Sequence, residues 1–261
     1  MTRFRPSRGG AAAAAVALLG FAIASCSTGV EGPDDVVDRM LAAYGCPGNL
    51  PLLTSYTGKG FMKQLPVGHV AVSHPFDVYQ KGSLYKMKTW QIREGMPVDM
   101  QVLAVGDTAR TRWTYSAGYA PVPSWEVELL EYRFPLVLRW LPASGLEGRL
   151  IEERGEDGAW RIRFEHDEDL LTLVVDGESW LLRGMILESA ADSSFRFEET
   201  YGDYRKVDGI WFPNRFAARF RGRQYYEYLI PTIELGAELP DGIFAVLPED
   251  TVLPPPAQSA R

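Results

Sequence analysis

An alternation of apolar and polar residues with a period of two runs through much of the chain from Ser55 onward. The apolar members are Trp160, Ile162 and Phe164; Phe216, Ala218 and Phe220; Val98, Met100, Val102 and Ala104; and Thr111, Trp113 and Tyr115. This period is typical of strands with one covered face and one wet face. Turn pairs such as Asp176-Gly177 and Asp208-Gly209 recur between the strands. The pattern predicts a mainly β (α+β) fold with about ten antiparallel strands.

Two segments instead carry a helical pattern. Apolar residues between 36 and 44 form one stripe, Asp34 is a candidate N-cap, and Gly45 suits the helix exit. The second segment, SWEVELLEYRFPLVLRWLP, runs from Ser124 to Pro142. A proline cannot sit inside an unbroken helix, so Pro135 should kink this segment or begin a second turn. We expect the second segment to cover the sheet.

The N-terminus has the pattern of an export signal. Residues 1–10 contain three arginines and no acid, and the uncharged run Ala11–Ala24 follows. This run is shorter than the roughly 20 apolar residues that a bilayer core requires. The rest of the sequence contains no apolar run that is long enough to span a bilayer. A basic start followed by a short apolar run is typical of a signal peptide. An uncleaved anchor and an ordinary signal peptide remain the alternatives.

The stretch Ile23-Ala24-Ser25-Cys26 resembles the lipobox of bacterial lipoproteins. The resemblance implies cleavage before Cys26, a diacylglyceryl group on its sulfur, and acylation of the new N-terminus by a chain such as palmitate. Several acyl chains would hold the protein on a membrane without a spanning helix. Ser27 stands where an inner-membrane retention signal would have Asp. The resemblance therefore implies an outer-membrane anchor facing the periplasm, if the cell has two membranes.

Composition and motifs exclude several functions. The formal net charge is −7, and loss of the arginine-containing leader would make the chain more acidic, which disfavours nucleic-acid binding. Nucleophile elbow, phosphate loop and dinucleotide fingerprint are absent, so we expect no cofactor. Three histidines without ligand-like spacing predict no metal site. With Cys26 acylated, Cys46 has no disulfide partner; it is either a small buried hydrophobe or a reactive thiol.

Acidic residues cluster at Glu165–Asp169, which could bind a cation through oxygen ligands. The cluster follows an alternating strand and precedes LLTLVV, so we interpret it as a solvated hairpin turn. Paired carboxylates could also cleave glycans, but no pair stands out. We therefore predict no catalytic residue and no enzymatic activity.

Aromatic residues are unusually frequent on the predicted strands. They include Trp90, Trp113, Trp160, Trp180, Trp211, Phe195, Phe197, Tyr226 and Tyr228. They could fill a core between a flat sheet and one helix layer. They could equally line an apolar cavity in a curved sheet that is closed by helices. The pattern alone leaves both possibilities open.

Four stretches together resemble the outer-membrane lipoprotein carrier superfamily, which contains the Lol-type carriers and receptors. They are VVDRMLAAYGCPGNLPLLTSYTGKG at 36–60, LLTLVVDGESWLLRGMILES at 170–189, ETYGDYRKVDGIWFPNRFAARF at 199–220 and IELGAELPDGIFAVLPED at 233–250. Asp-Tyr-Arg, a Val-Asp-Gly turn and Phe-Pro recur in that superfamily. Cys46 departs from it, because a second glycine is expected there. The carrier's gating arginine and the receptor's protruding leucine map onto no defined position.

The resemblance implies a curved antiparallel half-barrel whose concave apolar face is closed by helices and holds acyl chains of a lipid or lipoprotein. The implied organisation is a signal peptide (1–25), an acylated Cys26 with its tether (26–33), the half-barrel (34–250) and a disordered tail (251–261). We expect a monomer. The predicted ligand-binding residues are Trp113, Trp160, Phe195 and Phe197 on the floor, and Leu129, Leu130, Phe134, Val137, Trp140 and Leu141 on a movable lid.

Two other functions remain open. A protein-interaction lipoprotein in envelope assembly or stress sensing could have the same fold with a filled core. A hydrolase is the third hypothesis. Arg139, in the predicted lid, could meet a ligand head group or extend to water.

Overall fold

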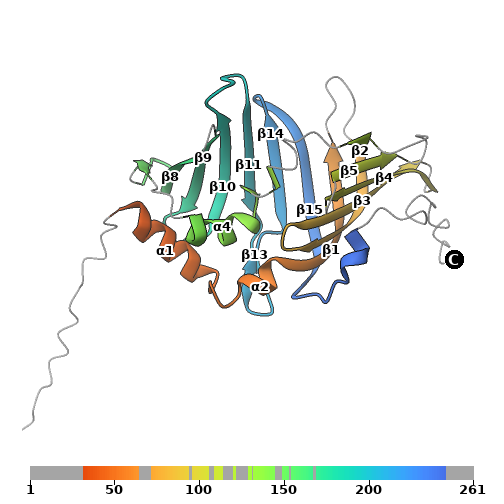
Figure 1. Ribbon diagram of the computed structural model, residues 1–261, viewed down its shortest axis with the longest axis horizontal. Helices are drawn as coiled ribbons and strands as arrows, with labels where there is room; N and C mark the ends of the chain where they lie inside the picture. The colour runs from red at the N-terminus through yellow and green to blue at the C-terminus, as the bar shows by residue number, and fades with distance from the viewer. Residues whose placement is uncertain are drawn as a thin grey trace, which may run out of the picture. The chain divides into compact units, whose positions relative to one another are not determined.

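The computed structural model describes residues 32–64, 72–93, 96–105, 109–113, 120–121, 129–130, 132–144, 149–152, 154–166 and 169–244. All of them belong to one unit of the chain, Glu31–Arg261. The predicted signal peptide, Cys26 and the predicted C-terminal tail lie outside the described residues. Figure 1 shows one large sheet with helices against it.

The large sheet contains 13 strands in the order β6-β5-β4-β3-β2-β1-β15-β14-β11-β10-β9-β8-β7. Each neighbouring pair is antiparallel. Its strands are β1 (Ser55–Gln64), β2 (Val72–Lys81), β3 (Leu84–Arg93), β4 (Met96–Val105), β5 (Ala109–Trp113), β6 (Ala120–Pro121), β7 (Arg149–Glu152), β8 (Ala159–His166), β9 (Asp169–Asp176), β10 (Leu182–Ser189), β11 (Arg196–Gly202), β14 (Arg215–Phe220) and β15 (Arg223–Leu235).

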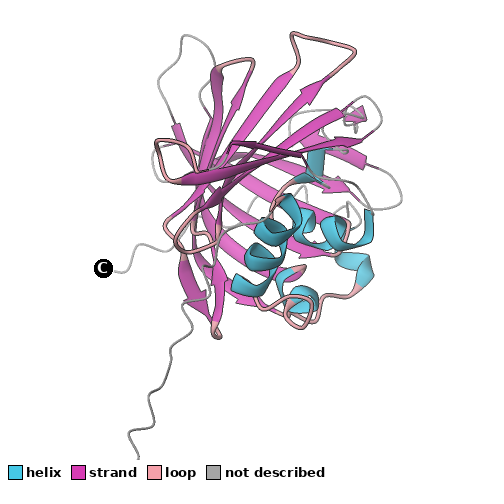
Figure 2. Cartoon of the chain, turned by 90° about the vertical axis from the view of Figure 1, so that its left-hand side faces the viewer, coloured by secondary structure: helices cyan, strands magenta, loops and turns pink. Residues whose placement is uncertain are grey.

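The middle strand of the sheet is β15, which pairs with β1 on one side and β14 on the other. The sheet order ends at β6 and β7, so the sheet is open. It curves around the helices, which lie on one of its faces (Figure 2). The predicted curved antiparallel half-barrel is confirmed. The prediction of about ten strands was low because short strands such as β6 are too brief to show a period of two.

A separate hairpin joins β12 (Arg205–Val207) to β13 (Ile210–Phe212). Its turn residues, Asp208 and Gly209, have φ values of 51° and 85°. Positive φ at both central residues of a two-residue connection matches the twist of the flanking strands. The predicted Val-Asp-Gly turn is therefore confirmed.

Helix α1 (Pro33–Ala43) forms the predicted first helix, followed by the short α2 (Leu50–Leu53). The prediction that Asp34 caps α1 was wrong: Gly32 is the N-cap and Pro33 occupies the first turn. Proline suits this position because its φ is already helical and no N–H is required there. Gly45 has a φ of 71°, which confirms the predicted exit. None of the helices within the described ranges is long and apolar enough to cross a membrane.

Pro135 separates two helical pieces, as predicted. Leu129, Leu130 and Tyr132 are helical before it, and α4 (Leu136–Ser144) begins directly after it. The predicted end at Pro142 was wrong, because α4 continues to Ser144. Pro135 has no backbone N–H to donate to a helical hydrogen bond. Burial of Val137, Leu138 and Leu141 stabilises α4 through packing. The start predicted at Ser124 lies outside the described residues.

Glycines on β1 permit a close approach of β15. The register of the two strands shifts between Lys59 and Phe61. A Cβ at Gly60 would collide with the backbone carbonyl of Leu229, and one at Gly58 would lie 2.8 Å from Cγ2 of Ile230. Backbone atoms cannot yield as a flexible side chain can, so Gly60 is the more restrictive position.

We therefore expect Gly60→Ala to lower the free energy of unfolding by roughly 1–3 kcal/mol, the usual cost of overpacking. Urea denaturation would measure the change. Gly202→Ala is the matched control, since a Cβ there meets nothing within 4 Å. Equal stability of the two variants would contradict the close approach.

Candidate functional site

Residues 129–130 and 132–144, called here the covering segment, lie against the face of the sheet that also carries α1 (Figures 1 and 2). Most of its apolar side chains are buried. They are Leu129, Tyr132, Phe134, Leu136, Val137, Leu138 and Leu141. Arg139 is exposed. The segment therefore has the amphipathic character that the sequence predicts for a cover.

Phe134 is the central contact between the covering segment and its surroundings. Its ring centroid lies 5.3 Å from that of Phe212 and 5.8 Å from that of Tyr201. It also lies 5.4 Å from the ring of Tyr44, at the end of α1. Aromatic pairs in these tilted and edge arrangements contribute beyond the area that they bury. One side chain thus joins α1, β11 and β13 to the covering segment.

A buried ion pair lies beside Phe134. Arg133 of the covering segment meets Glu199 of β11, with Nη2 2.6 Å from Oε1 and Nε 3.0 Å from both carboxylate oxygens. The Glu199 side chain has no exposed surface and that of Arg133 is 13% exposed. Two charges removed from water need close geometry and further hydrogen bonds to compensate their desolvation.

Tyrosines supply those further hydrogen bonds. The hydroxyls of Tyr226 and Tyr201 donate to Oε1 and Oε2 of Glu199 at 2.7 Å and 3.0 Å. Nη2 of Arg133 donates to the hydroxyl of Tyr228. The backbone N–H of Phe134 donates to the Tyr201 hydroxyl at 3.1 Å. The guanidinium carbon lies 5.4 Å and 5.8 Å from the ring centres of Tyr226 and Tyr228, within cation–π range.

The electrostatics of this cluster favour a charged arginine among neutral tyrosines. Burial opposes the charge of Arg133, yet Glu199 holds the pKa of its guanidinium well above the ordinary value. Burial raises the pKa of Tyr201, Tyr226 and Tyr228 well above that of a free tyrosine. The cluster thus joins one cation and one anion with uncharged hydroxyls around them.

A small cavity lies between the covering segment and strands β1, β2, β3 and β15. Its lining is Tyr56, Phe76, Val78, Gln80, Tyr85, Met87, Leu130, Arg133, Phe134, Tyr228 and Ile230. Its volume is about 20 Å³, which is room for one water molecule. Anything larger than a water molecule would enter only after side chains of this lining move aside.

The predicted ligand-binding residues are distributed over several places. Leu130 and Phe134 line the cavity, and Leu129, Val137 and Leu141 are buried in the covering segment. Phe197 is fully buried near Tyr226. Trp160 stacks on Trp180, and Phe195 packs against Phe220; neither lines the cavity. The side chains of Trp113 and Trp140 lie outside the described residues. Ligand contact by all ten residues stays a prediction.

The sequence analysis did not identify Arg133 and Glu199. A signal was present on β11, where Phe197, Glu199 and Tyr201 share one face because they alternate. A carboxylate at the middle position of an apolar face requires a buried partner. The alternation points to Glu199 but does not identify its partner, because Arg133 is 66 residues away in the chain.

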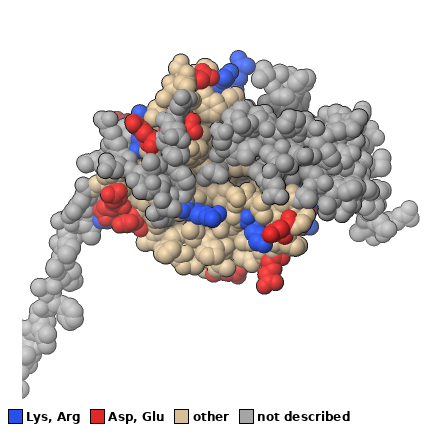
Figure 3. All heavy atoms as spheres, in the orientation of Figure 1, with Lys and Arg blue, Asp and Glu red and all other residues tan. Residues whose placement is uncertain are grey.

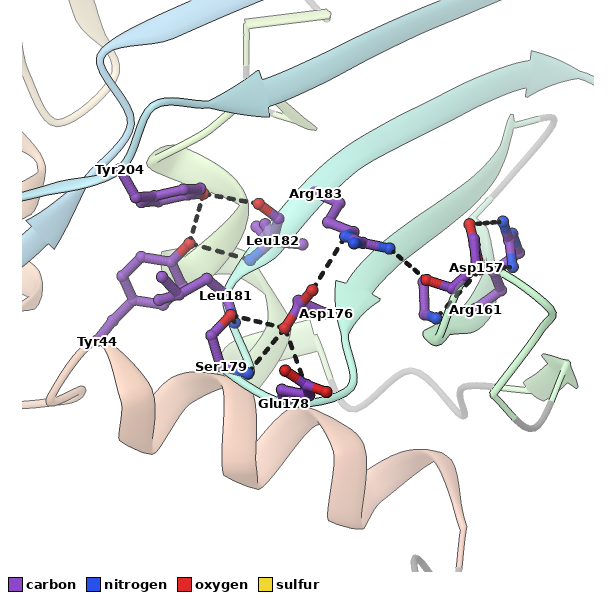
Figure 4. A network of polar contacts seen from close by, with 11 residues as sticks. Tyr44, Asp157, Arg161, Asp176, Glu178, Ser179, Leu181, Leu182, Arg183 and Tyr204 are labelled. Carbon is purple, nitrogen blue, oxygen red and sulfur yellow. Dashed lines mark hydrogen bonds and ion pairs between the residues drawn. The ribbon is translucent and has the colours of Figure 1, made fainter.

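A second polar network holds the end of α1 to the sheet (Figure 4). The hydroxyls of Tyr44 and Tyr204 lie 2.8 Å apart. Tyr44 accepts from the N–H of Leu182, and Tyr204 donates to the Leu182 carbonyl at 2.7 Å. Nearby, Arg183 of β10 pairs with the carboxylate of Asp176, the last residue of β9, at 3.0 Å. Its Nη1 also donates to the carbonyl of Asp157, just before β8, at 2.7 Å. This network is structural.

Other candidate chemistry is limited. Among the described residues, no group of three or more His, Cys, Asp and Glu could hold a metal ion. Burial raises the pKa of the half-buried Cys46 thiol, which keeps it protonated and less reactive. In the acidic cluster, Glu165 is exposed and Asp169 accepts a long 3.4 Å hydrogen bond from Tyr132. Acidic and basic side chains are scattered over the described part of the face in Figure 3.

Comparison with solved structures identifies this architecture. A LolA superfamily protein from Nitrosomonas europaea superposes with a TM-score of 0.55 at 10% sequence identity, covering 83% of this chain and 99% of that one. A DUF1329 family protein from Desulfovibrio piger also gives a TM-score of 0.55 at 11% identity, covering 83% and 98%. The fold is LolA-like. No protein-family model and no curated protein sequence matches the chain.

The LolA-like fold confirms, at the level of architecture, the resemblance found in the sequence. The stretch at 36–60 forms α1, α2 and the start of β1, and that at 170–189 forms the β9–β10 hairpin. The stretch at 199–220 contributes β11, the β12–β13 hairpin and β14. The final stretch ends β15 and includes the 3₁₀ turn Asp241–Phe244.

We expect Arg133→Met to cost roughly 3–5 kcal/mol of unfolding free energy, because it leaves the Glu199 carboxylate buried without a counter-ion. The double variant Arg133→Met/Glu199→Leu should lose much less than the sum of its single changes. Denaturant unfolding of the double-mutant cycle measures this coupling. Arg215→Met is the control, because its pair with Glu227 is half-exposed and should contribute less than about 1 kcal/mol. Additive losses would contradict a coupled pair.

The buried tyrosines predict a loss of stability in alkali. In the unfolded chain, tyrosine releases its proton near pH 10. In the folded chain, burial raises the pKa of Tyr201, Tyr226 and Tyr228, so unfolding releases protons. Stability should therefore hold below pH 10 and fall as the pH rises above it. Exposed tyrosines such as Tyr225 should ionise first, and the remaining rise in tyrosinate absorbance should coincide with the loss of far-UV circular dichroism; early ionisation of all tyrosines would contradict the burial of Tyr201, Tyr226 and Tyr228.

Proposed function

We propose that this protein is a membrane-anchored, periplasm-facing lipoprotein that binds acyl chains of a lipid or lipoprotein between the covering segment and the curved sheet. The observation that carries this proposal is the amphipathic covering segment, whose apolar side chains pack onto the enclosed face of an open LolA-like sheet. An acyl chain would replace these side chains. The binding step is burial, without covalent chemistry, so we propose no catalytic residue.

The energetic balance permits this replacement. Each buried methylene contributes roughly 0.8 kcal/mol, so about ten of them gain about 8 kcal/mol. Exposing one buried Leu or Phe side chain costs roughly 1.5–3 kcal/mol. A ligand of ordinary acyl length therefore offsets the displacement of two or three side chains, such as Leu130, Phe134 and Leu138.

The proposed membrane anchor comes from the sequence. The lipobox-like stretch ending at Cys26 would supply the acylated N-terminus, and Ser27 favours the outer membrane where two membranes exist. The carrier superfamily that the sequence resembles supports acyl chains as the cargo. The acidic composition is consistent with a lipid anchor rather than charge attraction to an anionic surface.

A second candidate is a protein-interaction lipoprotein with a filled core. The cavity of about 20 Å³ favours it, because the described interior is already occupied by Phe134 and its aromatic neighbours. In this case the covering segment would be a permanent part of the core. The two functions differ in whether the segment can be displaced by a ligand.

Native mass spectrometry after incubation with phospholipid and a diacylated peptide tests the primary proposal. The sample would be the mature chain, residues 26–261, with Cys26→Ser to keep it in solution. We expect a lipid adduct in this protein and its loss in Leu130→Glu, which places a charge in the cavity lining. Leu229→Glu should retain the adduct, because Leu229 is an exposed leucine on β15.

An apo mass for all three proteins would reject acyl binding and support the interaction module. Equal adducts in all three would retain acyl binding but remove it from the covering segment. Circular dichroism of each variant would verify that the sheet is folded.

A further inference from the structure

The cavity beneath the covering segment has a polar end and an apolar body. Tyr56, Gln80 and Tyr85 are cross-strand partners and form one row across β1, β2 and β3. The next row toward the other end of these strands contains Gly58, Val78 and Met87. Phe76 follows one row further on. Polar side chains at one end of an apolar surface match the two parts of an acylated molecule.

Hydrogen-bond donors exceed acceptors around this cavity. Nε and Nη2 of Arg133 are engaged by Glu199 and Tyr228, but no acceptor within the described residues is assigned to its Nη1. None is assigned to the hydroxyl hydrogens of Tyr56 and Tyr228. The Tyr85 hydroxyl donates only to the Met87 sulfur at 3.5 Å, a weak acceptor. Gln80 contributes one amide oxygen to the same row, since its Nε2 donates to the Gly82 carbonyl at 3.2 Å, so among the described residues these donors still outnumber the carbonyl acceptors.

The three tyrosines line the same cavity, with Tyr56 and Tyr85 in one row and Tyr228, the partner of Met62, one row beyond Phe76. Burial raises the pKa of Tyr56 and Tyr228, and that of Tyr85 to about 12, while the nearby charge of Arg133 opposes the rise in each case. Three sheet strands supply these hydroxyls, so they stay in place when the covering segment shifts. They remain neutral donors at physiological pH.

Charge decides which acceptor fits best. Glu199 already neutralises Arg133, with Oε1 2.6 Å from Nη2. An ionised carboxylate or phosphate would bring a second anion beside Glu199 without another cation in the lining. A neutral carbonyl oxygen accepts hydrogen bonds without that repulsion.

We propose that the hydroxyls of Tyr56 and Tyr85 donate to the carbonyl oxygen of an ester- or amide-linked acyl group whose chain runs over Val78 and Phe76. This inference rests on the proposed acyl binding and assigns its orientation and ligand class. Ester carbonyls occur in glycerolipids, and both ester and amide carbonyls occur in acylated lipoproteins.

Two ligands that differ only at the carbonyl test the proposal: dodecanoyl glycerol, an ester, and dodecyl glyceryl ether. Titration calorimetry on the mature Cys26→Ser chain should show the ester binding about tenfold more tightly, the effect of one or two net hydrogen bonds. Tyr56→Phe/Tyr85→Phe should reduce the ester-to-ether ratio to near one while the ether still binds. Tyr225→Phe, an exposed tyrosine on β15, should leave the ratio unchanged.

Ether binding by the double variant shows that it is folded, and comparing ratios cancels the different solubilities of the two ligands. Equal ratios in the parent chain and the double variant would overturn the carbonyl site and leave acyl binding intact. Failure of both ligands to bind the parent chain would instead reject the proposed function.

Two further ligands complete the test. Ionised dodecanoate should bind more weakly than the ester, and tighter binding would overturn the preference for a neutral oxygen. The amide N-dodecanoyl-aminopropanediol should also bind better than the ether. Tighter binding of the amide than of the ester would indicate an N-acylated chain end as the natural ligand, and the reverse order would indicate a glycerol ester. Equal binding of the amide and the ether would contradict the shared carbonyl chemistry.

Discussion

The buried pair between Arg133 and Glu199 is the constraint on which the rest of the interior depends. A carboxylate with no exposed surface needs a cation, and that cation comes from the covering segment rather than from the sheet. The segment is therefore fixed at one point by charge, while apolar contacts hold it on both sides. Tyrosines from β11 and β15 complete the polar shell, so the strands and the cover share one network.

This arrangement restricts how the interior can open. Separating Arg133 from Glu199 would leave two desolvated charges unpaired, whereas shifting Leu130 or Phe134 exposes only apolar surface. Apolar exposure costs roughly 1.5–3 kcal/mol per side chain, which the proposed acyl ligand would recover. Motion is thus expected around the ion pair rather than through it. The hydroxyls of Tyr56 and Tyr85 on the sheet would then face the proposed ligand, while Arg133 remains nearby.

The sequence predicts the architecture better than the site, for physical reasons. Period-two alternation and turn glycines are local, so the strands, the β12–β13 turn and the break at Pro135 follow directly from short stretches. Short strands such as β6 lack enough residues for a period. The ion pair joins residues 66 apart, and the Tyr56–Gln80–Tyr85 row requires the register of three strands. Neither a distant partner nor a register can be read from a single alternating stretch.

The tyrosine pair at the end of α1 has a mechanical consequence. Any pull on the chain ahead of Pro33 enters the domain through α1, which is tied at Tyr44 to Tyr204 and to both backbone groups of Leu182. The load then passes into β10, which is paired on both sides within the sheet. A pull at this end would thus act first on the hydrogen bonds to an interior strand. It would reach the covering segment only through the contact of Tyr44 with Phe134, so the sheet rather than the cover takes the load first.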